Sequence, residues 1–473
     1  MIGRAEEKKT IQYLMESKEA EFLAVTGRRR VGKTFLIDTV FADHICFKMV
    51  GIQNQGPEAQ LLNFAVKLSE FDEDADVVVP KNWQWAFIKL KSYLKKLPKD
   101  KKQVIFIDEL PWVAASDKSF VQMLAHLWND YISTQPHFIL VICGSATSWI
   151  IQKIIGDPGG MHNRVTMRIH MEPFSLSETK QFLDENGIGF NDQQIAKAYM
   201  AFGGIPYYLK YFKRGDTLVT GVNRICFKPS GGLRLEYQSL YSALFQNSDI
   251  HESIIKALAA KSSGLNRAEL KRAIEIKSNS SFDRAIDELV LSDFIVRDYP
   301  FGRKKRGVVY RLVDEFSIFY HRFMQQQNDY EPDYWSRTVE SQTYKIWLGH
   351  AFERLCRKHV GKIKDALRIS GMYAPASTLS IPPVDGKDGA QIDLLLDRAD
   401  EAINLCEMKF YADEFTISKN YSQKLLRKKW RFQEYTKTKK QVFITMVTNH
   451  PVKRNEWFLG TVDAVVTLDD IIR

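Results

Sequence analysis

The fold of this chain follows from residues 21–41, EFLAVTGRRRVGKTFLIDTVF. The first seven of these residues form an apolar run of strand length, and the amphipathic residues 33–41 predict a helix. The loop between them, GRRRVGKT, matches the pattern GxxxxGKS/T and lies after a strand and before a helix, as phosphate binding requires. The segment therefore predicts a nucleoside-triphosphate site of the P-loop type.

Each part of this loop has an expected role in holding ATP. The glycines let the backbone curl so that its N–H groups point at the phosphates, and the helix N-terminus adds a favourable potential. Lys33 brings positive charge to the β- and γ-phosphates, and Thr34 offers its hydroxyl to Mg²⁺. The expected contacts are Gly27, Arg28, Arg29, Arg30, Val31, Gly32, Lys33 and Thr34.

A second buried strand, QVIFIDE at residues 103–109, ends in two acids. We expect Asp108 to hold the magnesium ion and Glu109 to act as the general base that polarises the attacking water. Strands alternate with helices through this part of the chain, which predicts an α/β fold with a mainly parallel sheet covered on both faces.

A third strand, residues 137–144, leads into a polar segment. Ser145 is expected to reach between the γ-phosphate and the attacking water, with Thr147 as the alternative, although a helix N-cap explains a serine here equally well. Arg164 and Arg168 are candidates for a γ-phosphate contact, within the same chain or in a neighbouring copy. An ordinary surface ion pair is the other interpretation of both arginines.

The pattern of elements predicts four parts in the chain. Residues 1–172 are expected to form the ATPase core, and residues 173–247 a helical lid. Residues 248–330 predict three helices and then two short strands around a basic tip, which is the order of a winged helix. The aromatic residues 315–345 are interpreted as a connector, and residues 345–473 as a second α/β unit.

The expected winged helix has two features that suit DNA. The exposed start of its third helix carries small polar residues and an arginine, and four consecutive cations tip its wing. A helix in the major groove beside a cationic wing is a known way of binding DNA, although many such domains only join other domains. The residues are Ser278, Asn279, Ser280, Ser281 and Arg284 on the helix, with Arg303, Lys304, Lys305 and Arg306 on the wing.

Two neighbouring strands of the last part carry charged residues. Asp393 lies in the apolar run 391–397, where an acid without a partner is costly. Glu407 and Lys409 are two residues apart in the next strand, so they share a face, and a tight hairpin can place Asp393 beside them. Two acids and a lysine can hold Mg²⁺ and activate water for phosphodiester hydrolysis. A charged rim on a half-buried sheet is the alternative.

The composition is that of an ordinary globular protein of 473 residues with a net charge of +10, which suits a polyanionic partner such as nucleic acid. The basic helix expected at residues 419–432 fits the same partner, although its charges also suit a solvated face over an apolar core. Five scattered cysteines without a CxxC pair indicate reduced thiols in a cytoplasmic protein. We expect no signal peptide and no membrane contact, because no apolar run approaches about 18 residues.

Several segments together resemble the archaeal-type AAA+ ATPases, and more distantly the STAND and origin-recognition ATPases. They are IGR at residues 2–4 with Glu7, GRRRVGKT, VIFIDELPW, NRV followed by EPFSLSE, and GGIP at residues 203–206. In such proteins the opening GR segment and the GGxP segment flank the adenine. The resemblance therefore implies contacts from Ile2, Gly3, Arg4, Gly204 and Pro206.

Members of this family often end in a domain that resembles the restriction-endonuclease fold. Asp393, Glu407 and Lys409 match the D…ExK core of PD-(D/E)xK nucleases, and Glu353 on the preceding helix matches an additional acid of those enzymes. One departure is Ile392, which stands where those nucleases often have proline. Families of this kind can keep the fold without the chemistry.

These patterns predict a protein that binds and hydrolyses ATP with Mg²⁺, acts on DNA and carries a magnesium-dependent nuclease at its C-terminal end. A homo-oligomer is left open. One alternative is a non-cleaving, ATP-dependent DNA-binding regulator, and another is a protein-remodelling AAA+ ATPase. The acids and lysine of the last part favour a nuclease over the regulator, and the basic segments favour either over the remodelling machine.

Overall fold

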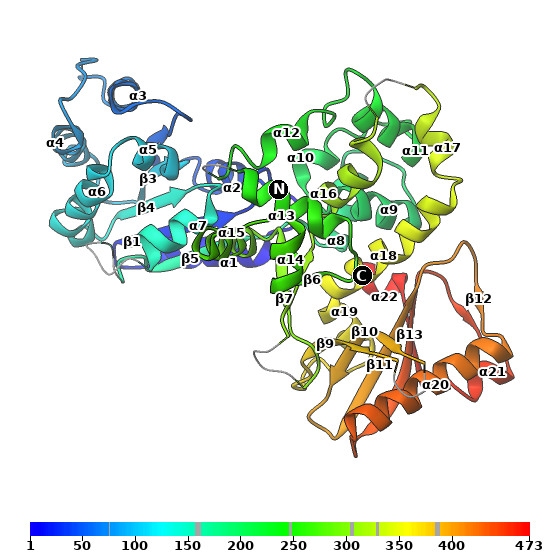
Figure 1. Cartoon of the computed structure of the whole chain (residues 1–473). Helices are drawn as coiled ribbons and strands as arrows, with labels where there is room; N and C mark the ends of the chain where they lie inside the picture. Colours follow the sequence, from blue (N-terminus) through cyan, green and yellow to red (C-terminus); the bar gives the residue numbers. More distant parts are fainter. Residues whose placement is uncertain are drawn as a thin grey trace. The chain divides into compact units, whose positions relative to one another are not determined.

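The computed structural model describes residues 1–473 except for 75, 157–160, 162, 246–247, 303–306, 328–330 and 384–387. The described chain forms two compact units (Figure 1). The first contains residues 1–173 and 291–293, and the second contains residues 174–290 and 294–473. The predicted wing tip, Arg303 to Arg306, lies outside the described residues.

The first unit is built around a five-stranded parallel sheet. Its strands are β1 (Glu21–Gly27), β2 (Ile45–Val50), β3 (Gln103–Asp108), β4 (Phe138–Cys143) and β5 (Met167–Met171). They lie in the order β2-β3-β4-β1-β5, and every residue of β1, β3 and β4 is buried. Complete burial is expected when helices cover both faces of a parallel sheet. The predicted α/β fold is thus confirmed for this unit.

Helices surround this sheet, and aromatic side chains fill the space between them. Trp83 is fully buried and packs edge-on against Phe64 and Phe120, with ring centroids 5.9 and 4.7 Å away. This packing holds three helices of the layer together. The helices are α1 (Ala5–Glu16), α2 (Lys33–Val40), α3 (Pro57–Phe71), α4 (Trp83–Leu94), α5 (Leu110–Ser116), α6 (Ser119–Asp130) and α7 (Thr147–Ile150).

The second unit begins with helices, as the sequence predicts. They are α8 (Leu176–Glu185), α9 (Asp192–Phe202), α10 (Pro206–Leu209), α11 (Leu218–Val222) and α12 (Glu236–Leu240). Ser175 caps α8 by accepting a hydrogen bond from the backbone N–H of Glu178, whose side chain accepts one from the N–H of Ser175 in return. This reciprocal capping fixes where the helical region starts.

Three helices and a small antiparallel sheet follow in the order that the sequence predicts. They are α13 (Asp249–Ala259), β6 (Leu265–Asn266), α14 (Arg267–Ala273), α15 (Asn279–Leu291), β7 (Ile295–Asp298) and β8 (Val309–Leu312), with sheet order β6-β8-β7. Ser278, Asn279 and Arg284, at and near the start of α15, are exposed. Beyond β7, the N–H of Phe301 donates to the carbonyl of Thr378, 3.0 Å away, so the hairpin is tied to the C-terminal part of this unit.

Residues 315–345 are not the connector that we expected from the sequence. They form α16 (Glu315–Phe319), a π-helical turn (Tyr320–Met324), α17 (Tyr334–Thr338) and the start of α18 (Gln342–Lys358). Their aromatic side chains form a core in which Phe319 and Phe323 lie 5.3 and 5.5 Å from the Trp335 ring. The expectation was wrong because apolar residues spaced along several short helices show no single periodicity in the sequence.

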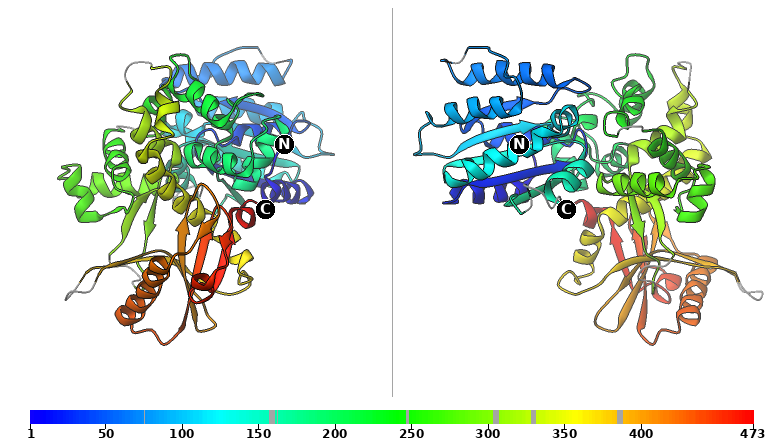
Figure 2. Two further views of the ribbon diagram at one scale, coloured as in Figure 1. Left: turned by 90° about the vertical axis from the view of Figure 1, so that its right-hand side faces the viewer. Right: turned by 60° about the vertical axis from the view of Figure 1, so that its left-hand side comes forward.

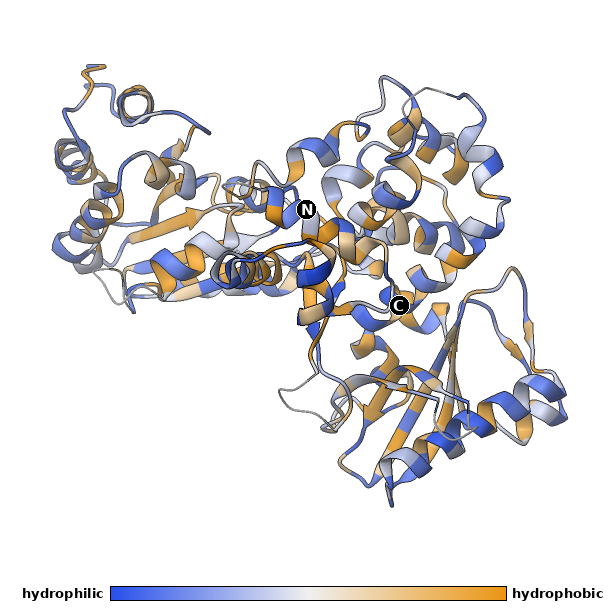
Figure 3. Cartoon of the chain, viewed as in Figure 1, coloured by the Kyte–Doolittle hydropathy of each residue, from blue (hydrophilic) through white to orange (hydrophobic). Residues whose placement is uncertain are grey.

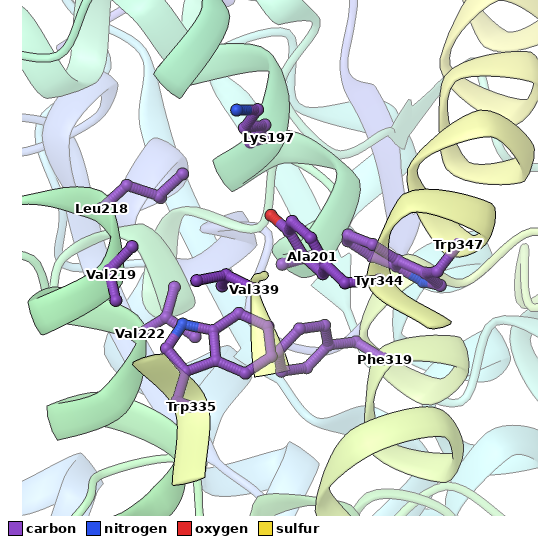
Figure 4. A pocket seen from close by; sticks show the side chains of 10 residues that line it. All are labelled: Lys197, Ala201, Leu218, Val219, Val222, Phe319, Trp335, Val339, Tyr344 and Trp347. Carbon is purple, nitrogen blue, oxygen red and sulfur yellow. The ribbon is translucent and has the colours of Figure 1, made fainter. Parts of the chain in front are cut away.

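Figure 4 shows the side chains around a cavity in this aromatic core. The cavity has a volume of about 10 Å³, and four of its ten lining residues are Phe319, Trp335, Tyr344 and Trp347. That volume is close to one water molecule, and apolar cavities of this size are ordinary packing features. We therefore assign the cavity to the core and not to a ligand site.

The C-terminal part of the second unit is a mixed five-stranded sheet in the order β15-β13-β11-β10-β9. Strand β10 is antiparallel to β9 and β11, whereas β11, β13 and β15 are mutually parallel. The elements are α19 (Val360–Ala366), β9 (Ala376–Ile381), β10 (Ala390–Asp397), β11 (Ala402–Lys409), β12 (Phe415–Thr416), α20 (Lys419–Thr436), β13 (Gln441–Thr448), β14 (Val452–Lys453), α21 (Glu456–Leu459), β15 (Ala464–Thr467) and α22 (Leu468–Ile472).

Helix α20 packs across β10 and β13 of this sheet (Figure 2). Figure 3 shows hydrophobic colour along the strands and mostly hydrophilic colour along α20. Leu425 and Phe432 are the buried residues that anchor the helix, and they lie two turns apart. Their burial fixes the rotation of α20 about its axis, which decides where its charged side chains point.

The cysteines fit the expectation of free thiols, since all five are buried and unpaired in the structure. Within the described ranges, no helix combines the length and the apolar character needed to cross a lipid bilayer.

The loop between α9 and α10 gives a stability prediction. Gly204 has φ 69°, and a Cβ there would lie 2.2 Å from the carbonyl oxygen of Phe174. We expect Gly204→Ala to lower the free energy of unfolding by about 1–2 kcal/mol from backbone strain and by roughly 1–3 kcal/mol more from the clash. Gly215→Ala is the control, because Gly215 also has a positive φ, 86°, but open space around it. Equal losses for the two variants in urea unfolding would contradict this explanation.

Candidate functional site

The backbone of the P-loop adopts a conformation that requires its glycines. Gly27 has φ 132°, and a Cβ there would lie 2.3 Å from the carbonyl oxygen of Met171 on β5. Gly32, the N-cap of α2, has φ 94°. L-residues rarely adopt such angles, so both positions favour glycine. The loop consequently ends with the first N–H groups of α2 directed outward, which is an arrangement that binds phosphate.

Lys33 lies inside this loop and not in solvent. Its Nζ donates hydrogen bonds to the carbonyls of Gly27 and Arg28, at 2.9 and 2.7 Å, and lies 3.3 Å from Oγ of Ser145. Burial lowers the pKa of Lys33 below its ordinary value, although Glu109 and Asp108 oppose that shift. An ammonium group that is partly desolvated gains stability from an anion such as a triphosphate.

Thr34 and Asp108 supply adjacent oxygens for a metal ion. The Thr34 hydroxyl donates to Oδ2 of Asp108 over 2.6 Å, from the start of α2 to the end of β3. A hydroxyl and a carboxylate are hard oxygen ligands, and neighbouring ligands of octahedral Mg²⁺ lie about 3 Å apart. The pair therefore fits magnesium, which would neutralise phosphate charge when bound.

Glu109 is held by the segment that follows β4. Oγ of Ser145 donates to Oε1 of Glu109 over 2.7 Å, and the Ser145 N–H donates to Oε2 over 3.0 Å. Ser145 thus contacts both Glu109 and Lys33, and its side chain does not cap α7. Thr147, the first residue of α7, accepts a hydrogen bond from the Gly27 N–H over 3.1 Å, and this contact stabilises the start of the P-loop.

The opening segment is tied to the P-loop by Arg4. Its guanidinium is buried and donates to the carbonyls of Val31 and Glu172, at 3.0 and 2.7 Å. Glu7 pairs with the same guanidinium at 3.2 Å. The structure therefore brings residues 2–4 to the loop, although Ile2 and Gly3 are themselves only half-buried.

The other predicted ATP contacts differ in burial. Arg28 and Val31 are buried within the loop, whereas Arg29 and Arg30 are partly exposed. Arg164 and Arg168 are exposed, and neither pairs with an acid in the described parts of the chain. Gly204 and Pro206 belong to the second unit, where Pro206 begins α10. Gly203 ends α9 as its C-cap, with φ 68°.

The C-terminal acids lie close together in the second sheet. Leu394 pairs with Cys406 at the end of the β10–β11 ladder, and the N–H of Met408, the neighbour of Glu407, donates to Oδ2 of Asp393 over 3.5 Å. Both carboxylates are 6% exposed. Burial, with the charges of Glu353 and Glu407, raises the pKa of Asp393 to about 6.

Two further predicted residues join this pair. Nζ of Lys409 lies 3.0 Å from Oε1 of Glu407. Glu353 comes from α18, which packs on β11, and its Oε2 pairs with Nη2 of Arg357 at 3.3 Å. Nε of Arg357 donates to the Asp393 carbonyl over 3.2 Å, so this arginine links the helix to the strand. Burial would raise the pKa of Glu353, but His350 and Arg357 hold it below its ordinary value.

Sequence reasoning missed three residues of this cluster. Arg357 is one, and the others are Tyr421 and Lys428 of α20, which both contact the Glu407 carboxylate. A spacing of seven residues puts Tyr421 and Lys428 on the same side of the helix. That spacing was a usable signal, although many residues of a basic helix share it.

The cluster has the residue types of a metal-dependent hydrolase, but its described side chains do not form a complete set of metal ligands. Within the part of the chain that the structure describes, no three His, Cys, Asp or Glu side chains lie close enough to hold a metal ion. Asp393 and Glu407 are the two hard oxygen ligands that fit magnesium at this face. The charges around them are those of the cations Lys409, Lys428 and Arg357 and of one further acid, Glu353.

Comparisons with known proteins agree with the nucleotide site at the P-loop. Residues 1–212 match the family described as "ATPase domain predominantly from Archaea". An uncharacterized protein of Methanocaldococcus jannaschii, MJECL04, is 24% identical over 363 residues, which cover 76% of each chain.

One solved structure supports the fold. The Walker-type ATPase PABY2304 of Pyrococcus abyssi has a TM-score of 0.53 at 15% identity, covering 68% of this chain and 96% of that one. The chain is also similar to the ORC2 protein of Aeropyrum pernix, with a TM-score of 0.42 at 13% identity, covering 72% and 95%. The family match at residues 1–212 agrees with the geometry of the loop within them, which is that of a P-loop nucleotide site.

Proposed function

We propose that this protein is a magnesium-dependent ATPase whose nucleotide site governs a DNA-cleaving C-terminal domain. The observations that support a DNA-cleaving domain are the contact of the Asp393 carboxylate with the Met408 N–H, next to Glu407, and the pairing of Glu407 with Lys409. Asp393 and Glu407 would hold Mg²⁺, which supplies charge stabilisation when bound. Lys409 would orient the water whose oxygen attacks phosphorus while the P–O bond to the leaving group breaks.

We propose that the chain has four parts with the boundaries predicted from the sequence. The helices and hairpin of residues 248–330 have the element order of a winged helix, and residues 345–473 have the mixed sheet expected of a restriction-endonuclease-like domain. Exposed polar residues at the start of α15 and exposed cations of α20, such as Lys424 and Arg427, support DNA as the partner. Arg164 and Arg168, being exposed, suit a phosphate contact in a neighbouring copy of the chain.

The test of the nuclease is a plasmid-nicking assay with Mg²⁺ or Mn²⁺, with and without ATP. We expect nicking by the wild type, and a loss of about 10²–10³-fold in Asp393→Asn, because one of two metal-binding charges is removed. ATP hydrolysis should be unchanged in that variant. Asp397→Asn is the matched control: Asp397 lies on the same strand, but it pairs with Lys440 at 2.6 Å and lies outside the cluster. Equal nicking by Asp393→Asn and wild type would contradict the assignment.

One observation favours a second function. The Glu407 carboxylate already has three protein partners, so the cluster is also stable as a structural ion network without a metal. A non-cleaving, ATP-dependent DNA-binding regulator would have such a network. The absence of nicking with either metal, together with salt-sensitive DNA binding, would identify this second function.

A further inference from the structure

The carboxylate of Glu407 has more cationic partners than the D…ExK pattern requires. Its Oε1 lies 3.0 Å from Nζ of Lys409 and accepts a hydrogen bond from the Tyr421 hydroxyl over 3.1 Å. Its Oε2 pairs with Nζ of Lys428. Both carboxylate oxygens of a buried side chain are therefore engaged, and two of the three partners come from α20.

The position of Lys428 follows from how α20 is held. Ser418 caps the helix by accepting a hydrogen bond from the N–H of Tyr421 over 3.2 Å. Leu425 is buried against Ile444 and Met446 of β13 and their neighbours, and Phe432 is buried against apolar residues of β9, β10 and β11 and Val442 of β13. With the start and the rotation of the helix fixed, Tyr421 and Lys428 face Glu407 together, whereas Arg427 and Trp430 lie on the exposed side.

The acids of the cluster already have cationic partners without a metal ion. Lys409 and Lys428 act on Asp393 and Glu407, and Arg357 acts on Glu353. A divalent cation on Asp393 and Glu407 would add two charges to a buried site. A metal ion on Oε2 would lie beside the Lys428 ammonium group, and the repulsion between these two cations in a buried site favours the departure of one of the protein cations.

Lys428 is the cation that can leave most easily. Lys409 shares its strand with Glu407 and reaches it from two residues away, whereas Lys428 reaches it by a flexible four-carbon chain from a separate helix. Its side chain is only 17% exposed, so a released ammonium group stays beside the cluster. The partner for a cation released there is the phosphate of a bound nucleic acid strand.

We propose that Lys428 is an exchangeable positioning residue of this site: it holds Glu407 when no metal is bound, and it moves to a phosphate of the nucleic acid when a divalent metal takes its place. This inference rests on the proposed nuclease function. It adds that α20 sets the metal affinity of the site and positions the substrate, so the helix is part of the site and not only its cover.

The test measures Mn²⁺ binding to the full chain without nucleotide, by the electron paramagnetic resonance signal of free Mn²⁺. We expect Lys428→Met to bind Mn²⁺ about tenfold more tightly than wild type, within the usual range of coupling between competing ligands. Lys428→Gln keeps a hydrogen-bond donor for Glu407 and should also bind more tightly, which guards against a folding defect in Lys428→Met. Asp393→Asn should abolish the binding and so assign the signal to this site.

Tyr421→Phe is the matched control, because it removes a neutral hydrogen bond to Glu407 from the same helix face. Its Mn²⁺ affinity should change by less than about threefold. If both Lys428 variants bind Mn²⁺ with unchanged or weaker affinity, and Asp393→Asn still loses the binding, then Lys428 does not exchange with a metal ion at Glu407.

The rate of DNA nicking at saturating Mn²⁺ tests the proposed contact of Lys428 with a phosphate of the nucleic acid. We expect it to be at least about tenfold slower in Lys428→Met, because a phosphate contact is lost. A nicking rate of Lys428→Met equal to that of the wild type would overturn the proposed phosphate contact. If no variant nicks DNA but the Lys428 variants bind Mn²⁺ more tightly, the nuclease proposal fails and the exchange at Glu407 stands.

Discussion

Replacement of Lys33 by alanine should abolish ATP turnover, with a loss of at least about 10²–10³-fold. Lys33 is the buried cation at the start of α2, and its Nζ donates to the carbonyls of Gly27 and Arg28 within the phosphate-binding loop. No other lysine of the loop can replace it, since the remaining cations of GRRRVGKT are arginines that precede Gly32. The measurements are ATP hydrolysis and nucleotide binding by the purified variant.

The fold should survive this change. Burial lowers the pKa of Lys33, which shows that its charged form is not favoured by the surrounding protein alone. Thermal unfolding of Lys33→Ala should therefore stay close to that of the wild type. Lys91→Ala is the control, because Lys91 lies on α4 in an exposed pair with Asp130 and should leave turnover unchanged. Normal ATPase activity in a folded Lys33→Ala protein would refute the assignment of the loop.

Replacement of Glu109 by glutamine should separate ATP binding from hydrolysis. An amide keeps the shape of the side chain but cannot accept a proton, so turnover should fall by roughly 10²-fold or more. Lys33, Thr34 and Asp108 are unchanged in the variant, and ATP should bind with near wild-type affinity. Single-turnover hydrolysis and equilibrium binding of labelled ATP measure the two effects.

The geometry of Glu109 makes the prediction specific. Ser145 donates two hydrogen bonds to its carboxylate, at 2.7 and 3.0 Å, which fix the orientation of the base toward a water molecule. Glu70→Gln is the control, because Glu70 is an exposed carboxylate of α3 that pairs with Lys67. Wild-type hydrolysis by Glu109→Gln would show that another group is the base.

The sequence predicted the parts of the protein that are local in the chain. The P-loop is one example: its glycines, Lys33 and Thr34 lie within eight consecutive residues, and the flanking strand and helix differ by at most one residue from those predicted. The hairpin of β10 and β11, in which Leu394 pairs with Cys406, is another, because a short turn between two apolar runs fixes the register of the strands.

The sequence failed where contacts between distant segments decide the structure. Residues 315–345 form part of an aromatic core with partners such as Phe227, whose ring stacks on that of Trp335 at 5.2 Å. Neither residue shows this role by its position in the chain. A run of aromatic and polar residues without a clear period is compatible with a connector as well as with a core.

What the sequence by itself determined is the ATP site, since its residues form a contiguous motif whose backbone conformation follows from glycines and from the start of a helix. Only the tertiary structure decided which helix-borne cations contact the C-terminal acids. Arg357 pairs with Glu353 and Lys428 pairs with Glu407, and either cation could have faced solvent. The burial of Leu425 and Phe432 sets the rotation of α20, so packing directs Lys428 toward the carboxylate.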